Sequence, residues 1–461
     1  MFANYLSPFS WRYGSPEMRQ LFSEENKFKL WRKIWVALAQ AQQQAGLVSA
    51  KELEDLEKNQ NNINIERILE IEKEVKHDVV AAIREFAEKA EVGGGKIHLG
   101  ATSYDIVDNA DALLIKDGLS LVENRIKTIL RLLAEKTRQY ADFPCIGYTH
   151  LQPAEPTTVG YRLAFYAQDL LIALESLRFA RMMLKGKGFK GAAGTAASYQ
   201  MLLAGTKLTA DELEKQVMKD LGIEAVLISN QVFPRQFHFM VLNALVGVTT
   251  ALAKFAGDLR ILQSPLFGEW SEPFGKKQVG SSAMPFKKNP INAENICSLA
   301  RYVAALPIIA SGNASLSYLE RTLDDSANKR LFIPEAFLAT DQILITAEKI
   351  ISGLVINEKK ISYNLAQYAP FAATELILVA AVKNGADRQK THEVLREISM
   401  RAWAVIQEGK SNPMATSLTE NSHLKKYLTK QKISTLLDVQ KYVGTAPERA
   451  LKLVEIINKL S

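Results

Sequence analysis

The stretch DNADALLIKDGLSLVENRIKTILRLLAEKTRQYA, residues Asp108–Ala141, decides the fold. It contains no proline, and apolar residues recur at the spacing of one helix face: Leu113, Leu114, Leu121, Ile126, Ile129, Leu130 and Leu133. The longer helices of this kind span about 40 Å at roughly 1.5 Å per residue. The apolar face of such a helix must be covered by other elements.

Four more runs share this pattern. They are Thr157–Leu184, Gln236–Leu262, Glu294–Ala310 with an expected bend at Pro307, and Pro334–Leu354 with a proline near its start. Five such runs predict an all-α subunit built around an elongated helix bundle, and not an α/β sheet. Strand signals are scarce, and the best candidate is the short stretch Ala225–Ile228.

Shorter helices joined by polar turns are predicted on both sides of the bundle. The sequence therefore predicts three domains: an N-terminal helical domain (1–102), the long bundle (103–356) and a C-terminal helical domain (357–461). Two bundle stretches, Val241–Val246 and Ile308–Ala310, are apolar on most sides. Such helices must be buried on most sides, so we expect them to pack against other subunits. A monomer with a thick five-helix core is the alternative.

Composition narrows the class of protein. The 461 residues are 47% hydrophobic and 23% charged, as in ordinary globular proteins, and the net charge is +7. Lysine and arginine are interspersed with acidic residues, with no basic block, so an acidic small-molecule substrate fits better than a nucleic acid. No signal peptide and no apolar stretch of membrane-spanning length is expected. Two cysteines, Cys145 and Cys297, favour a reducing cytoplasm.

The loop GSSAMPFKKNP, residues Gly280–Pro290, is the strongest candidate for chemistry. It combines a flexible glycine, two hydroxyls and the cations Lys287 and Lys288. Asn289 is a good N-cap and Pro290 a good first helical residue. We therefore expect the next helix to direct its unpaired N–H groups at a bound anion. The spacing alone is equally compatible with a basic surface turn.

Three histidines, His77, His98 and His150, lie in polar segments punctuated by glycine or proline. Each is a candidate acid or base, although a single histidine is more often structural. No histidine has cysteine or a second histidine at metal-ligand spacing, so neither a metal nor a cofactor is expected. Thr102 and Ser103 precede the first long helix, where they can cap it or bind an anion.

A charged stretch, Glu320–Arg330, is either a solvated turn or a binding element. Arg321 and Arg330 can grip a phosphate or carboxylate through paired N–H donors. Near the N-terminus, Arg12 and Tyr13 can add a phosphate contact and a stacking ring.

Together these motifs resemble the fumarase/aspartase superfamily, and within it the adenylosuccinate lyase family. The resemblance includes Gly280–Pro290 and six other segments: Ser7–Met18, Lys76–Val79, His98–Ser103, Thr149–His150, Gln152–Ala154 and Glu320–Asn328. Matches extend from residue 5 to about residue 400, and they look most like the eukaryotic-type branch.

The resemblance implies an all-α, three-domain subunit in a homotetramer, with a central twenty-helix core and four active sites each built from three subunits. It implies β-elimination of fumarate from adenylosuccinate, giving AMP, and from the succinyl-carboxamide ribotide SAICAR, giving AICAR. A carbon–nitrogen lyase of purine biosynthesis that needs no cofactor is expected.

The resemblance also implies residue roles. Ser281 would be the general base and His150 the general acid, while Lys287 and Asn289 would stabilise the carbanion as an aci-carboxylate. A serine hydroxyl is a weak base and needs activation by nearby positive charge. The residues implied in substrate binding are Arg12, Tyr13, Lys76, His77, Asp78, Thr102, Ser103, Gln231, Lys287, Asn289, Arg321, Ser326 and Arg330.

One residue departs from the family pattern. Asn295 stands where related members often carry a substrate-binding arginine, which leaves the balance between the two substrates open. A lyase acting on argininosuccinate is an alternative that the Arg321–Asn328 segment disfavours. A non-catalytic helical scaffold is another, and it would not need Ser281, His150, Lys287 and Asn289.

Overall fold

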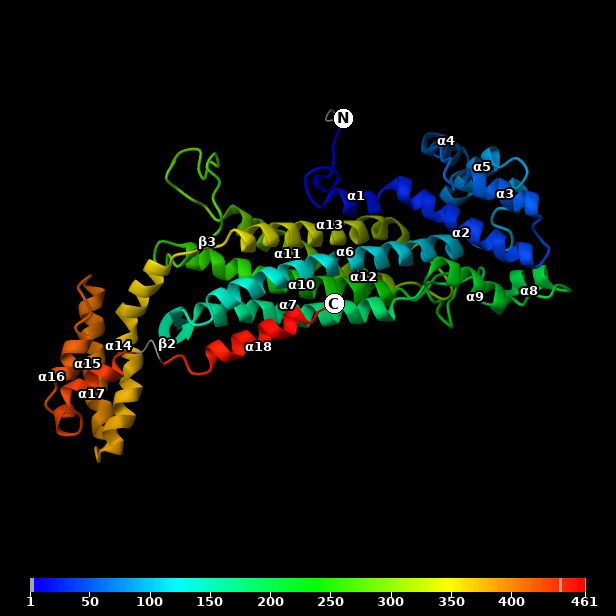
Figure 1. The fold of residues 1–461 in the computed structure, drawn as a ribbon. Helices are drawn as coiled ribbons and strands as arrows, with labels where there is room; N and C mark the ends of the chain where they lie inside the picture. Colours follow the sequence, from blue (N-terminus) through cyan, green and yellow to red (C-terminus); the bar gives the residue numbers. More distant parts are fainter. Residues whose placement is uncertain (1–3, 439–441, 461) are drawn as a thin grey trace. The chain divides into compact units, whose positions relative to one another are not determined.

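The computed structural model describes residues 4–438 and 442–460 (Figure 1). The described chain is predominantly α-helical, as the periodicity predicts. It divides into two compact units. The first unit comprises 1–126, 173–250 and 298–345, and the second comprises 127–172, 251–297 and 346–461. The boundaries fall inside long helices, so these units divide the chain differently from the three predicted domains, which remain a prediction.

The five long runs of the sequence form six helices. Their bounds are α6 (Ser103–Gln139), α7 (Val159–Met183), α10 (Gln236–Gln263), α11 (Ile291–Ala305), α12 (Pro307–Ser315) and α13 (Asp324–Ser352). Pro307 separates α11 from α12, as expected. The predicted start of the last run is wrong, because α13 begins ten residues before Pro334, which lies inside the helix. Asp324 and Asp325 in its first turn favour the earlier start, since carboxylates stabilise a helix N-terminus.

The remaining helices of the first unit are short except α2 (Glu24–Gln44), which has 21 residues. The others are α1 (Pro16–Leu21), α3 (Ala50–Asn59), α4 (Ile65–Val75), α5 (Asp78–Lys89), α8 (Ala197–Leu203) and α9 (Ala210–Leu221). A core that includes Trp31, Trp35 and Phe86 joins them. Arg32 and Glu85 form a buried ion pair beside this core, with the Arg32 guanidinium stacked on the Phe86 ring. The apolar faces of these helices therefore pack against one another and are shielded from solvent.

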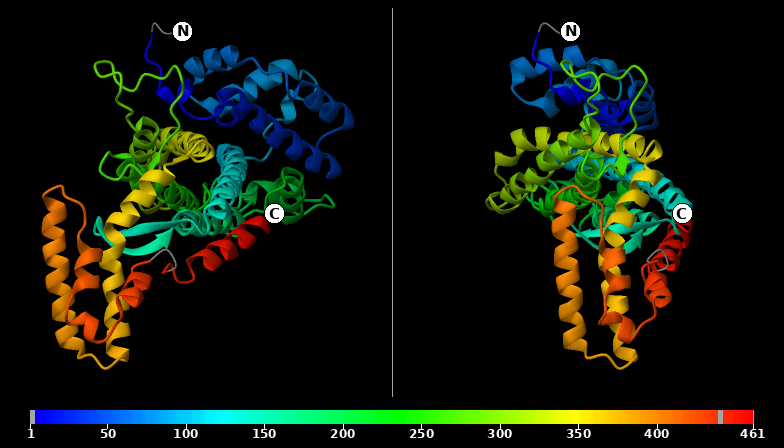
Figure 2. Two further views of the ribbon diagram at one scale, coloured as in Figure 1. Left: turned by 60° about the vertical axis from the view of Figure 1, so that its left-hand side comes forward. Right: turned by 90° about the vertical axis from the view of Figure 1, so that its left-hand side faces the viewer.

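In the second unit, α14 (Glu358–Lys383) packs against two strands and against α15 (Arg388–Gln407). Figure 2 shows α14 and α15 running side by side. The other helices of this unit are α16 (Met414–Glu420), α17 (Lys430–Leu436) and α18 (Ala446–Asn458). A small core under α14 and α15 includes Ile377, Leu395 and Leu424.

The described chain contains four strands in two small sheets. Strands β1 (Pro144–Thr149) and β2 (Gln152–Thr158) form an antiparallel hairpin, and β3 (Trp270–Ser271) pairs with β4 (Val355–Ile356). The predicted strand Ala225–Ile228 is wrong, because there Ala225 forms an isolated bridge to Gly186. The hairpin was not predicted, since Pro153 and Pro156 in β2 weaken any strand signal.

Three helical stretches are more apolar than the sequence analysis expects. By length and composition, Gln236–Gln263, Ile291–Ser315 and Glu358–Lys383 could each cross a membrane, so the expectation that no stretch reaches that length is wrong. In α10, 56% of the most apolar window is buried inside the structure. Most of the apolar stretch Val241–Val246 is thus covered by the chain itself, whereas Ile308 on α12 is 76% exposed.

Candidate functional site

A cavity of about 770 Å³ lies in the first unit. Eight residues that the sequence assigns to substrate binding line it: Lys76, His77, Asp78, Thr102, Ser103, Gln231, Ser326 and Arg330. They come from the α4–α5 turn, the start of α6, the loop before α10 and the start of α13. The fold thus brings together residues that are separated by up to 254 positions in the chain.

The α4–α5 turn directs cationic and hydrogen-bonding groups toward the cavity. Lys76 ends α4 in the left-handed region, with φ of 55°, and His77 caps α5 by accepting a hydrogen bond from Val80 N at its Nδ1 (3.4 Å). Asp78 Oδ2 lies 2.8 Å from Arg330 Nη2, so these two cavity residues pair with each other in this structure. Both side chains are partly exposed, and an incoming anion can exchange for the carboxylate on Arg330.

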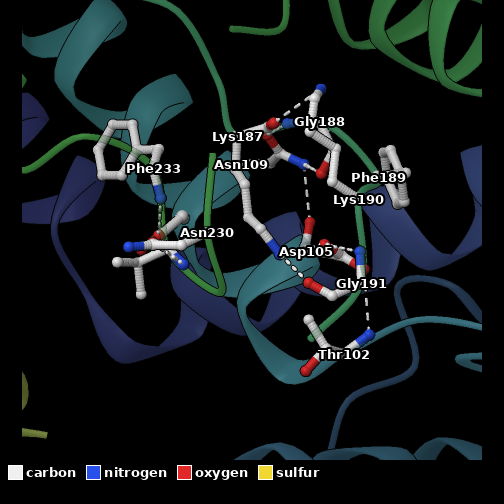
Figure 3. A network of polar contacts seen from close by, with 12 residues as sticks. Thr102, Asp105, Asn109, Lys187, Gly188, Phe189, Lys190, Gly191, Asn230 and Phe233 are labelled. Atoms are coloured by element: carbon white, nitrogen blue, oxygen red, sulfur yellow. Dashed lines mark hydrogen bonds and ion pairs between the residues drawn. The ribbon is translucent and has the colours of Figure 1, made fainter. Parts of the chain in front are cut away.

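The start of α6 is fixed by a buried carboxylate, Asp105 (Figure 3). Its Oδ2 accepts hydrogen bonds from Thr102 N (3.0 Å) and Tyr199 Oη (3.0 Å), and its Oδ1 pairs with the buried Lys187. Gly191 N, from the glycine-rich loop before α8, donates to both carboxylate oxygens at 3.3 Å. Burial, followed by the Asp105 charge, raises the pKa of Tyr199 well above its usual value. Asp105 therefore holds the backbone that presents Thr102 and Ser103.

A second buried network supports the α13 side of the cavity. Arg235 joins two carboxylates, with Nη1 2.9 Å from Asp108 Oδ1 and Nε 2.6 Å from Asp325 Oδ2. Burial raises the pKa of Asp108, but the charges of Arg235 and Lys329 outweigh it, so the net pKa shift is downward. Lys329 lines the cavity and lies 2.6 Å from Asp111 Oδ2.

Arg321, by contrast, pairs with other side chains of the protein. Its Nη1 lies 2.7 Å from Asp325 Oδ1, its guanidinium lies 4.1 Å from the centre of the Tyr104 ring, and its side chain is 11% exposed. It lies outside the cavity lining, as do Arg12 and Tyr13 in the turn that follows Pro8–Ser10. Lys329 lines the cavity and was not assigned a role, although it lies within the charged stretch Glu320–Arg330.

His98 has a structural environment. It accepts a hydrogen bond at Nδ1 from Trp35 Nε1 (3.0 Å), and the two rings meet edge to face. Burial lowers the pKa of His98 to about 4, so the ring is neutral at neutral pH. The hydrogen bond from Trp35 and the edge-to-face packing therefore explain the presence of His98 in structural terms.

In the second unit, His150 lies at the tip of the β1–β2 hairpin. Thr149 pairs with Gln152, so His150 and Leu151 form a two-residue turn, and their φ values are 52° and 59°. Hairpin turns of this length favour asparagine and glycine, because both central residues need positive φ. Keeping two larger residues there costs free energy, and such strain is typical of functional positions.

The loop that carries Ser281 is folded back on itself. Ser281 Oγ accepts hydrogen bonds from Met284 N (3.1 Å) and Ala283 N (3.4 Å), and Asn289 Nδ2 donates to Gly280 O (2.9 Å). A Cβ at Gly280 would lie 1.9 Å from Lys287 O, so this crossing requires glycine. Lys287 itself is exposed.

The helix after this loop differs from the expectation. It begins at Ile291, and its first N–H groups are already bonded by Glu272, a buried residue: Oε1 accepts from Asn292 N (3.3 Å) and Oε2 from Ala293 N (3.1 Å). Asn289 acts as a bridge to Gly280 and not as the cap. The predicted anion site at this helix start is therefore occupied by a carboxylate of the protein.

Comparisons with known proteins identify the class. Residues 12–305 match the lyase family, and residues 370–452 match the family described as the adenylosuccinate lyase C-terminus. The fold is also that of a fumarate lyase from Mesorhizobium sp. BNC1, with a TM-score of 0.84 at 24% identity over 98% of this chain and 99% of that one. A 3-carboxy-cis,cis-muconate lactonizing enzyme from Pseudomonas putida gives a TM-score of 0.86 at 22% identity, with the same coverage.

Relatives narrow the class further. The chain is 37% identical to the adenylosuccinate lyase of Saccharomyces cerevisiae, covering 98% of this chain and 94% of that protein. It is 38% identical to the adenylosuccinate lyase of Methanocaldococcus jannaschii, covering 96% and 94%. The chain belongs to the adenylosuccinate lyase family of carbon–nitrogen lyases. Yeast and archaeal relatives are about equally similar, so identity does not assign it to a eukaryotic branch.

Proposed function

We propose that this enzyme eliminates fumarate from adenylosuccinate to give AMP, and from SAICAR to give AICAR. The observation that supports this most directly is the cavity in the first unit, where eight residues expected to bind a phosphorylated dianion come together. Lys76 and Arg330 supply positive charge there, and Thr102, Ser103 and Gln231 supply hydrogen-bonding groups.

In the proposed chemistry, Ser281 Oγ takes the proton from the carbon β to the departing nitrogen. The electron pair forms an aci-carboxylate, the carbon–nitrogen bond then breaks, and His150 gives a proton to the nitrogen as fumarate leaves. Two backbone N–H groups already donate to Ser281 Oγ, and such bonds favour its ionised form. Lys287 would stabilise both the alkoxide and the developing carboxylate charge.

We also propose a homotetramer in the cytoplasm with active sites shared between subunits. Large apolar residues remain exposed along α7 in the single chain, namely Phe165, Ile172, Phe179 and Met182. They recur at helical spacing, and contiguous exposed apolar surface is typical of subunit interfaces. Ile308 and Ile309 on α12 add to the exposed apolar surface.

The test is direct. Purified protein is mixed with adenylosuccinate and, separately, with SAICAR, and the loss of substrate absorbance and the appearance of fumarate are followed. Fumarate from neither substrate would refute the proposed function. Mixing inactive Ser281→Ala and His150→Ala proteins tests sharing, because mixed tetramers regain activity if a site takes these residues from different chains.

A further inference from the structure

The segment Glu269–Glu272, which we call the anchor segment, lies between the end of α10 and the Ser281 loop. Its backbone is held on two sides: Glu269 N donates to Leu262 O (3.0 Å), and Asn357 N donates to Glu269 O (2.8 Å). Its two central residues form β3, paired with β4, and Trp270 is 2% exposed. The segment is thus a fixed point within the second unit.

The carboxylate at one end of the anchor segment holds the hairpin. Glu269 is fully buried, and it accepts hydrogen bonds from Tyr148 Oη (2.8 Å), Arg162 Nη1 (2.9 Å) and Asn364 Nδ2 (3.0 Å). Arg162 Nη2 also donates to Ile146 O (2.6 Å). The ring of Tyr148 packs edge to face on Phe267, with centroids 4.9 Å apart.

These contacts bear on the tip of the hairpin. Ile146 and Tyr148 lie on β1, and Tyr148 is two residues before His150. The strained turn that carries His150 is exposed, and it continues directly from β1. The direction of the His150 side chain therefore depends on how firmly β1 is held.

The carboxylate at the other end holds the loop. Glu272 is 2% exposed, and the donors it receives are the backbone N–H groups of Asn292 and Ala293 and the amide of Asn292 (2.9 Å). Its own N–H donates to Gln263 Oε1 (2.9 Å), and Gln263 Nε2 donates to Lys288 O (3.0 Å). Glu272 and Gln263 together fix the end of the loop that returns to α11.

We propose that Glu269 and Glu272 are positioning residues, Glu269 for the hairpin that carries His150 and Glu272 for the loop that carries Ser281. The proposal rests on the proposed roles of those two residues in fumarate elimination. Burying a carboxylate is costly unless its hydrogen bonds are complete, and both carboxylates have at least three donors aimed at them. Misplacing a catalytic group by about 1 Å can lower the rate about 100-fold, so the residues that hold such a group in place affect the rate.

The mildest test of the hairpin side is Tyr148→Phe, which removes the hydroxyl and keeps the ring on Phe267. Glu269→Gln is the stronger variant, because it turns an amide N–H₂ toward Arg162 or Tyr148. We expect kcat to fall about threefold or more in the first and about tenfold or more in the second, with KM for adenylosuccinate within about threefold of the wild-type value.

Glu272→Ala tests the loop side, because it leaves the amides of Asn292 and Ala293 without their acceptor. We expect a similar fall in kcat with little change in KM. Glu123→Gln is the matched control: it removes a partly buried carboxylate that pairs with Arg178 and Arg181 and lies outside the anchor segment. Its kcat should match the wild type.

Hydrogen exchange gives a readout that does not depend on activity. Glu269→Gln should speed amide exchange across 144–152 and leave 286–294 unchanged, and Glu272→Ala should do the reverse. If the wild-type protein releases no fumarate, the proposed function fails. The opposite exchange changes in the two variants then still test whether Glu269 holds the hairpin and Glu272 holds the loop. Identical exchange changes in both variants, or unchanged kcat in Tyr148→Phe, Glu269→Gln and Glu272→Ala of an active enzyme, would overturn the proposal.

Discussion

The cavity of the first unit and the Ser281 loop of the second unit are held in place by different kinds of contact. Around the cavity, binding groups are backed by buried charges: Asp105 behind Thr102, and Asp108 and Arg235 behind Lys329. Ser281 instead lies on an exposed loop whose described hydrogen bonds are mostly to its own backbone. The residues proposed to bind substrate are therefore held by a buried polar network, whereas the proposed general base lies on a loop that has fewer contacts with the rest of the protein.

The largest effect is expected at the two residues proposed to transfer protons. Ser281→Ala and His150→Ala should each lower kcat by at least about 100-fold, the range expected for loss of a general acid or base. His150 is exposed and Ser281 is partly exposed, so thermal stability should stay near that of the wild type. Steady-state kinetics and a melting curve check this, and a large loss of stability would recast the residues as structural.

The buried ion pairs of Arg235 should respond in the opposite way, because their loss should lower stability. Arg235→Leu leaves Asp108 and Asp325 buried without their shared cation, so the free energy of unfolding should fall by about 3 to 5 kcal/mol. Arg67→Leu is the control, because Arg67 pairs with Glu88 at an exposed site and its loss should leave the free energy of unfolding near the wild-type value. Denaturant unfolding of both variants measures the difference. Equal losses of unfolding free energy would show that the Arg235 network stabilises the fold no more than an exposed ion pair does.

The pKa of His98 predicts a pH dependence of stability. The folded-state pKa is about 4 and the unfolded value is 6.5, so between these pH values the unfolded state binds the extra proton. Stability should therefore fall as the pH is lowered from 6.5 to 4, by up to about 3 kcal/mol from this residue. His98→Asn, which tolerates the positive φ, should flatten that slope in melting curves. His392→Asn, at an exposed site, should leave the slope unchanged.

The smallest effect on stability is expected in the loop. Gly280→Ala must displace Lys287 O, so kcat should fall by about tenfold or more, while the melting temperature changes little because the loop is exposed. Gly275→Ala is the control in the same loop, since its Cβ would make an ordinary contact with Gln278 at 3.7 Å. Equal kcat in the two variants would show that the crossing at Gly280 is not needed.

Periodicity alone was enough to predict the long helices, because their apolar residues follow one helix face. It missed the β1–β2 hairpin, whose prolines hide it, and it placed the start of α13 at Pro334 instead of Asp324. Eight of the residues predicted to bind substrate line one cavity, and their roles in binding stay predictions.

The supporting carboxylates could not be found from the sequence. Asp105, Asp108, Glu269 and Glu272 belong to residue types that are usually exposed, and their partners lie far away in the chain. Lys187 pairs with Asp105 from 82 positions away, and Trp35 is 63 positions from His98. Distances of that kind are set by tertiary packing, which local patterns do not contain.

The capping of α11 by Glu272 has a consequence for how the enzyme responds to salt. Because the N–H groups at the helix start already donate to the protein's own carboxylate, the positive charges that this loop offers to the proposed dianionic substrate are those of Lys287 and Lys288. Both lysines are exposed, and the field of an exposed charge is screened over about 8 Å at physiological ionic strength. Under the proposed function, attraction of the substrate by this loop is therefore expected to weaken as the salt concentration rises.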